Sequence, residues 1–193
     1  QGSSSMTVMI EPHGDASILD PSTLKTIEEA IATIEEDPMV GGVQSIIPFV
    51  KRMNQLLGPA EGEVVHSDEA EEDFFDFFAF DDDFFFGFDD EPLYEEELIA
   101  TAGGQGEYEI PSNPERYGLA NQQELSNLIA QYLLLYSGNL DTFINDPLEP
   151  DATALTLVMK SSDTEQVRSF THLIPTLFPE SWSIEIGGGE AVA

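Results

Sequence analysis

The stretch ATALTLVMK, Ala152–Lys160, decides the fold that we expect for this chain. Its large apolar residues Leu155, Leu157 and Met159 stand at every second position. That period of two is typical of a β-strand with one buried face. Such a face must pack against other elements, and the flanking segments have the patterns of strands and helices that can cover it.

A helix and a second strand follow this stretch. Ser162 and Glu165 have the spacing of a helix-capping box, and Pro179 ends the helical pattern. The segment Trp182–Ile186 alternates apolar and polar residues, as a half-buried strand does. The apolar residues expected on one side of the helix are Val167, Phe170, Ile174 and Leu177.

The first half of the chain has the same order of strand, helix and strand. Thr7–Ile10 is a short apolar run, while Asp20 and Pro21 suit the cap and the first turn of a helix. The run VGGVQSII predicts a strand ending near Pro48, and a short basic helix is expected at Phe49–Leu57. The expected apolar face of the first helix comprises Leu24, Ile27, Ile31 and Ile34.

A further helix is predicted between the two halves. Asn121 and Glu124 have capping-box spacing, and Gly138 suits a helix terminus. We interpret the apolar stripe of this helix as core rather than as a ligand pocket. The stripe comprises Leu125, Leu128, Ile129, Tyr132, Leu133 and Tyr136.

Together these segments predict an α+β fold. Two strand, helix, strand units sharing one four-stranded mixed sheet, with helices on one face, form a ferredoxin-like split βαβ sandwich. The alternative is an α+β sandwich with a different strand order. We expect the first half at residues 6–59, a long acidic Phe-rich insertion at 60–110, and the second half at 111–193. The opening residues 1–5 read as an expression-tag remnant and are left out of the expected fold.

The charge of the chain limits its partners and is concentrated in the insertion. The chain has 38 acidic and six basic residues, for a net charge of −32. Nucleic acid needs clustered cations, so we expect no nucleic-acid partner. Residues 61–109 hold 19 acidic residues and no basic one. Because this boundary is sharp, replacing Glu61–Glu109 with a short Gly and Ser linker should leave the core folded.

The insertion is also rich in phenylalanine. Nine of the 13 phenylalanines lie in EEDFFDFFAFDDDFFFGFDDE, Glu71–Glu91. We interpret Phe77, Phe78, Phe85 and Phe86 as an apolar contact surface for a neighbouring subunit, a hydrophobic substrate or a membrane leaflet. The alternative is an acidic aromatic loop without a fixed partner.

No residue pattern in the sequence predicts catalysis, a cofactor or a bound metal. The carboxylates around Gly87 do not follow the ligand order of an EF-hand loop, so diffuse cation binding is expected there. His13, His66 and His172 are too far apart for a metal motif, and the chain has no cysteine. We therefore expect no catalytic residue, no cofactor, no metal site and no enzymatic activity.

Three segments resemble the extracytoplasmic domains of exporters of the resistance, nodulation and division (RND) superfamily, including its lipid-exporter branch. They are VGGVQSIIPFVKRMNQLL (Val40–Leu57), NQQELSNLIAQYLLLYSG (Asn121–Gly138), and the later strand with the helix opening SSDTEQVRSF. The element QYLLLY is the most specific of these, and the acidic insertion has no counterpart in the family pattern.

The resemblance implies a ferredoxin-like domain between two transmembrane helices of a cell-membrane exporter, on the extracytoplasmic side. Its implied partners are the rest of the exporter chain, other protomers and a hydrophobic or lipid-like substrate. The family's proton-relay carboxylates lie in the membrane helices, so no residue of this chain takes that role. No apolar stretch here approaches the roughly 20 residues of a spanning helix, and we expect this fragment to be soluble.

Two other classes of function stay open. One is a free-standing ligand-binding or regulatory module of ferredoxin-like fold. The other is a secreted acidic protein that binds calcium or a basic partner through the insertion.

Overall fold

The computed structural model describes most of the chain outside the acidic insertion, and the chain divides into two compact units. Unit 1 comprises Gln1–Val50 with Ser126–Ala193, and unit 2 comprises Lys51–Leu125. The described residues are 4–14, 16–59, 106–134, 140–146, 149–160 and 164–187.

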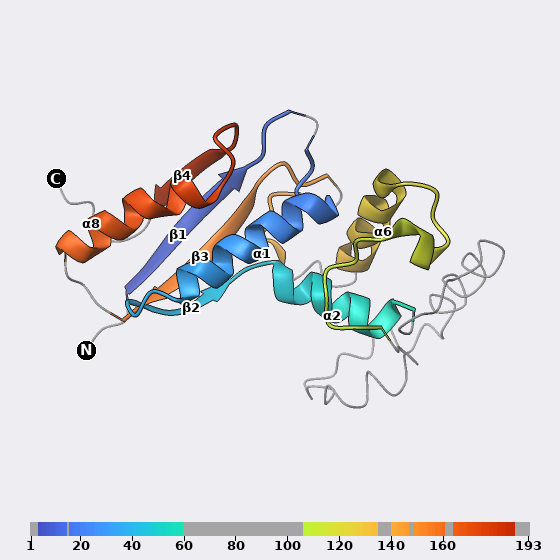
Figure 1. The fold of residues 1–193 in the computed structure, drawn as a ribbon, viewed down its shortest axis with the longest axis horizontal. Coiled ribbons are helices and arrows are strands. Elements are labelled where there is room, and N and C mark those ends of the chain that lie inside the picture. The colour runs from blue at the N-terminus through green and yellow to red at the C-terminus, as the bar shows by residue number, and fades with distance from the viewer. Residues whose placement is uncertain are drawn as a thin grey trace. The chain divides into compact units, whose positions relative to one another are not determined.

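Unit 1 is built on one four-stranded antiparallel sheet, so the expected α+β class is confirmed. Its strands are β1 (Ser4–Glu11), β2 (Val40–Gln44), β3 (Thr153–Met159) and β4 (Ser183–Gly187), in the order β2-β3-β1-β4 (Figure 1). All three neighbouring pairs are antiparallel, and the expected mixed sheet is therefore wrong. The reason is that each helical connection joins two strands that are not neighbours, because a strand from the other half of the chain lies between them.

The register places the large apolar side chains of the central strands on one face of the sheet. Val8 in β1 lies opposite Leu155 in β3 and Ile186 in β4, and opposed residues of an antiparallel pair point to the same side. Helices α1 (Pro21–Glu35) and α8 (Thr164–Leu173) lie on one side of the sheet (Figure 1). The predicted alternation in β3 is confirmed, and the buried side chains of this face include Met6, Val8, Ile10, Leu155, Leu157 and Met159.

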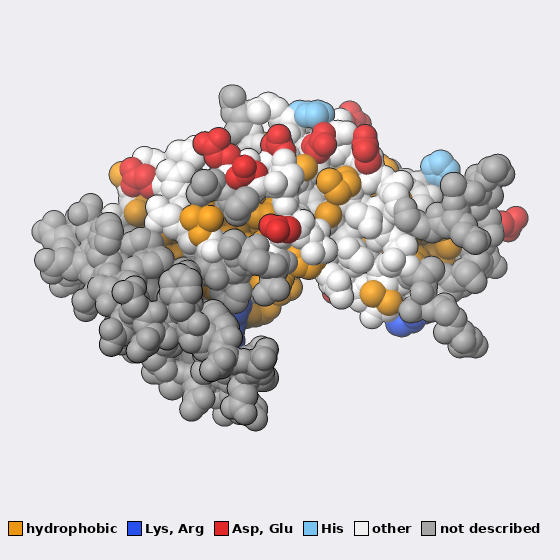
Figure 2. Space-filling model, turned by 180° about the vertical axis from the view of Figure 1, so that it is seen from behind, with side chains coloured by type: hydrophobic (Ala, Val, Ile, Leu, Met, Phe, Trp, Pro, Cys, Tyr) orange, Lys and Arg blue, Asp and Glu red, His pale blue; other side chains and the backbone are white. Residues whose placement is uncertain are grey.

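The opposite face of the sheet is mixed in character. Thr7 lies opposite Thr156, and Met9 lies opposite Ala154. Thr7, Met9 and Thr156 are half-buried, whereas Ala154 is buried. Seen from behind, the molecule shows many more acidic than basic side chains, as the net charge predicts (Figure 2).

Helix α1 begins as predicted, but its cap works differently. Asp20 stands at the N-cap and Pro21 opens the first turn, yet the Asp20 carboxylate accepts no hydrogen bond from the helix. It accepts instead from the backbone N–H of Ser17 at 2.9 Å and from the hydroxyl of Ser126 at 2.8 Å. Asp20 thus ties the start of α1 to a distant segment of unit 1. The large apolar residues buried in α1 are Leu24, Ile27 and Ile34, whereas Ile31 is only half-buried.

The boundary between β2 and the next helix differs from the expected one. The strand ends at Gln44, and α2 spans Ile47–Leu57, so the predicted strand up to Pro48 is too long. Ser45 accepts a hydrogen bond through Oγ from the N–H of Ile47 at 3.3 Å. Pro48 then falls in the first helical turn, where its missing N–H leaves no helical hydrogen bond unmade.

Two other element ends depart from the predictions. Strand β1 starts at Ser4, and Ser4 and Ser5 pair with Met159 and Val158, so residues left out of the expected fold belong to the sheet. The last predicted helix divides into α8 and a 3₁₀ turn, η2 (Ile174–Leu177). Pro175 explains the division, because it has no N–H to donate to an α-helical hydrogen bond.

Helix α6 spans Gln122–Leu134. Its predicted cap is confirmed, since the N–H of Glu124 donates to Oδ1 of Asn121 at 3.0 Å. Tyr136 and Gly138 lie outside the described residues. Among the helices that the structure describes, none has the length and apolar character needed to cross a bilayer. The stripe residues buried in α6 are Leu125, Ile129, Tyr132 and Leu133.

Candidate functional site

The residues expected to make apolar contacts, Phe77, Phe78, Phe85 and Phe86, lie outside the described part of the chain, as does Gly87 with its surrounding carboxylates. Their predicted roles stay predictions. Among the described residues, no group of three or more His, Cys, Asp or Glu side chains is arranged to hold a metal ion.

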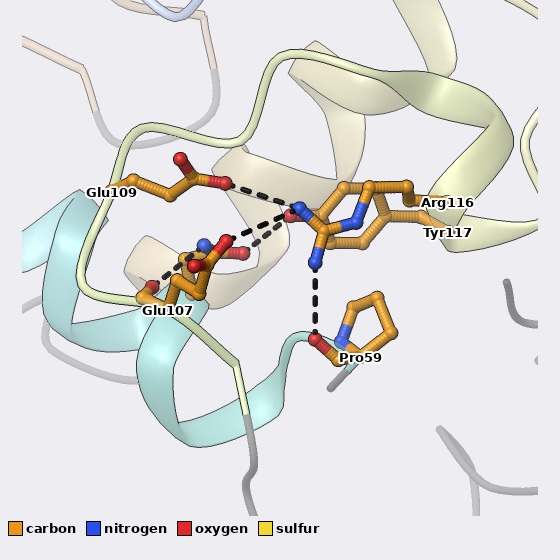
Figure 3. Close-up of polar contacts among 6 residues, drawn as sticks. Pro59, Glu107, Glu109, Arg116 and Tyr117 are labelled. Carbon is orange, nitrogen blue, oxygen red and sulfur yellow. Dashed lines mark hydrogen bonds and ion pairs between the residues drawn. The ribbon is translucent and has the colours of Figure 1, made fainter. Parts of the chain in front are cut away.

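Among the described residues, six form a connected set of polar contacts in unit 2, on the two sides of segment 60–105 (Figure 3). We call these six residues the clasp. One lies in α2 and one in the turn after it. Two lie in η1, a 3₁₀ turn over Pro114–Tyr117, and two in the segment that precedes η1. The clasp comprises Asn54, Pro59, Glu107, Glu109, Arg116 and Tyr117.

The turn η1 has its own start and stop signals. The side chain of Asn113 accepts a hydrogen bond from the N–H of Glu115 at 3.1 Å, and Pro114 occupies the first turn. Gly118 ends the turn with φ 70°, a left-handed conformation that glycine adopts without strain. These signals fix the backbone that carries the last two clasp residues.

A neutral buried pair forms the inner part of the clasp. Asn54 is 2% exposed and Tyr117 is 6% exposed. The Tyr117 hydroxyl donates to Oδ1 of Asn54 at 2.5 Å, and Nδ2 of Asn54 donates to the carbonyl of Glu107 at 2.9 Å. One buried amide therefore joins α2, η1 and the segment before η1.

A charged part surrounds the neutral pair. Nη1 of Arg116 lies 3.2 Å from Oε1 of Glu109 and 3.7 Å from Oε2 of Glu107. Nη2 of Arg116 donates to the carbonyl of Pro59 at 3.5 Å. The two glutamates are about half exposed, so each ion pair alone is weak and is screened by salt.

Two glycines allow the backbones of the clasp to approach each other. A Cβ atom at Gly106 would lie 2.0 Å from the carbonyl oxygen of Asn54 and 3.1 Å from Cα of Gly58. A Cβ atom at Gly58 would lie 2.4 Å from the same oxygen. Residues on the two sides of segment 60–105 are therefore neighbours in space.

The buried phenol of Tyr117 has a perturbed acidity. Burial raises the pKa of Tyr117 from 10.0 to about 12, and the charges of Glu109 and Glu107 act in the same direction. The Arg116 charge lowers this pKa but does not offset the burial. Tyr117 therefore stays protonated at neutral pH and acts in the clasp as a hydrogen-bond donor.

This pKa predicts a stability loss at alkaline pH. Because the folded pKa is above the unfolded one, the contribution of Tyr117 is complete below about pH 10 and is lost as the pH rises toward 12. In urea unfolding, the stability advantage of the wild type over Tyr117→Phe should shrink across this range. An advantage that stays constant from pH 9 to 12 would contradict the assignment.

Sequence reasoning missed the clasp. The insertion expected at residues 60–110 includes both Glu107 and Glu109. The available signal was the run SNPERYG, Ser112–Gly118, in which Asn precedes a single turn, Pro opens it and Gly follows it.

Comparisons with protein-family models, with curated proteins and with solved structures yield no match to the chain.

Proposed function

We propose that the chain is a ferredoxin-like extracytoplasmic domain of an RND-type membrane exporter that handles a hydrophobic or lipid-like substrate. Its partners are then the rest of the exporter chain and other protomers. Its contribution is shape and apolar surface rather than covalent chemistry.

The sheet order β2-β3-β1-β4 is the observation that supports this proposal most. With α1 and α8 as connections, all neighbouring strands antiparallel and helices on one side, the order agrees with a split βαβ arrangement. A fold alone hosts many functions, so the transport role rests on the resemblance of Val40–Leu57 and Asn121–Gly138 to exporter domains.

The coding sequence on both sides of this chain tests the proposal. The exporter function requires an apolar stretch of about 20 residues close to each end of the domain. Polar sequence on both sides would refute it. A free-standing ligand-binding module, or an acidic module that binds calcium or a basic partner, would then take its place.

A further inference from the structure

We propose that the clasp is an anchor sufficient to hold residues 51–59 and 106–125 together. Residues 59 and 106, which flank the acidic segment, then stay in fixed positions relative to each other. Changes within the segment do not alter the clasp. This inference does not rest on the proposed function.

The neutral pair is the part of the anchor that is independent of salt. Asn54 and Tyr117 are both buried, and their hydrogen bond joins groups that carry no charge at neutral pH. Nδ2 of Asn54 also donates to the carbonyl of Glu107, on the other side of segment 60–105. Removing one partner leaves the other buried without its hydrogen bond. This costs more folding free energy than replacing both partners by apolar groups.

Arg116 is the part of the anchor that responds to salt. Its guanidinium lies between the carboxylates of Glu107 and Glu109, which would otherwise repel each other. Without Arg116 these two carboxylates repel each other, and added salt screens that repulsion.

The close approach at Gly106 is a contact between the backbones on the two sides of segment 60–105. Gly58 and Gly106 approach the carbonyl of Asn54 so closely that neither position accommodates a Cβ atom. Among the described residues, contacts between residues 54–59 and 106–117 thus join the two sides of segment 60–105.

Hydrogen exchange in the full chain, read by NMR at low and high salt, tests the two parts separately. The reporters are the amides of Gly58 and Leu119, which donate to Asn54 and Pro114 in unit 2. Asn54→Leu should speed their exchange about tenfold or more at both salt concentrations. Arg116→Ala should speed it at low salt only, and Arg168→Ala, which removes the same charge from an exposed site on α8, should leave it unchanged.

Further variants keep the test decisive. If Asn54→Leu also speeds exchange of the sheet amide Ala154, which donates to Phe143, the milder Tyr117→Phe replaces it. The pair Asn54→Leu with Tyr117→Phe should recover part of the protection, because both buried polar partners are then gone. Unchanged reporter rates in Asn54→Leu, or an Arg116→Ala effect equal at both salt concentrations, would overturn the proposal.

Excision of the acidic segment tests the independence of the anchor. A short Gly and Ser linker joins Pro59 to Gly106, so that all clasp residues stay in place. The anchor predicts that the Gly58 and Leu119 amides exchange within about threefold of their wild-type rates, a change small on the free-energy scale of local opening. Loss of their protection, with the sheet amides still protected, would show that the clasp depends on residues 60–105.

Discussion

Replacing Leu155 with alanine should lower the free energy of unfolding by about 2–5 kcal/mol, the cost typical of a cavity in a close-packed core. Leu155 lies in β3, a central strand of the sheet, and it is fully buried opposite Val8, which is also fully buried. Urea unfolding at neutral pH measures the change.

Leu173→Ala is the matched control for this prediction. It makes the same change at the last residue of α8, where the side chain is 44% exposed. A surface site of this kind should change stability by no more than about 0.5 kcal/mol. Similar losses in the two variants would show that the sheet face assigned to Leu155 is not the core.

Replacing Gly106 with alanine should destabilise unit 2 by about 1–3 kcal/mol, the usual cost of forcing an extra methyl group into a packed site. The added Cβ would lie 2.0 Å from the backbone oxygen of Asn54, and a backbone atom cannot swing away as a side chain does. The two sides of the clasp must therefore separate. Hydrogen exchange of the Gly58 amide reports the effect locally.

Gly42→Ala is the control for this second prediction. Gly42 lies in β2, and a Cβ atom built there meets nothing within 4 Å. We expect this variant to be as stable as the wild type, or slightly more stable because alanine restricts the unfolded chain. If Gly106→Ala proved equally harmless, the close approach of the two backbones would be refuted.

Local periodicity made most of unit 1 predictable. Alternating Leu155, Leu157 and Met159 identified β3, and the cap at Asn121 identified the start of α6, because each signal lies within a few residues. The ends of the strands and helices were less predictable. The β-branched run before Pro48 resembles a strand, but the hydrogen bonds from Ile47 to Ser45 and from Val50 to Ile46 show that a helix has begun.

The relative direction of the strands and the contacts of the clasp could not be predicted from the sequence, for a different reason. Both depend on contacts between distant segments, and hydrophobic periodicity records only which residues are buried. Asn54 and Tyr117 are 63 residues apart, and neither stands in a motif that predicts the other. Asp20 likewise has the sequence of a helix cap, but its partner Ser126 is 106 residues away.

The position of the clasp also changes how the acidic segment should be removed. Excision of Glu61–Glu109, as the charge boundary suggests, would delete two described carboxylates that lie beside Arg116 and the carbonyl that accepts a hydrogen bond from Asn54. Excision of residues 60–105 keeps them. The charge pattern marks where the sequence changes composition, whereas the contacts show where the fold resumes.

The central claim, an extracytoplasmic domain of a membrane exporter, is tested most directly by thiol labelling in intact cells. The chain has no cysteine, so Glu180→Cys places one thiol of this domain at an exposed turn of unit 1, in a parent protein without other cysteines. A membrane-impermeant maleimide should label intact cells as fully as a permeant one. Labelling by the permeant reagent alone, with the impermeant one reacting only after lysis, would contradict the claim.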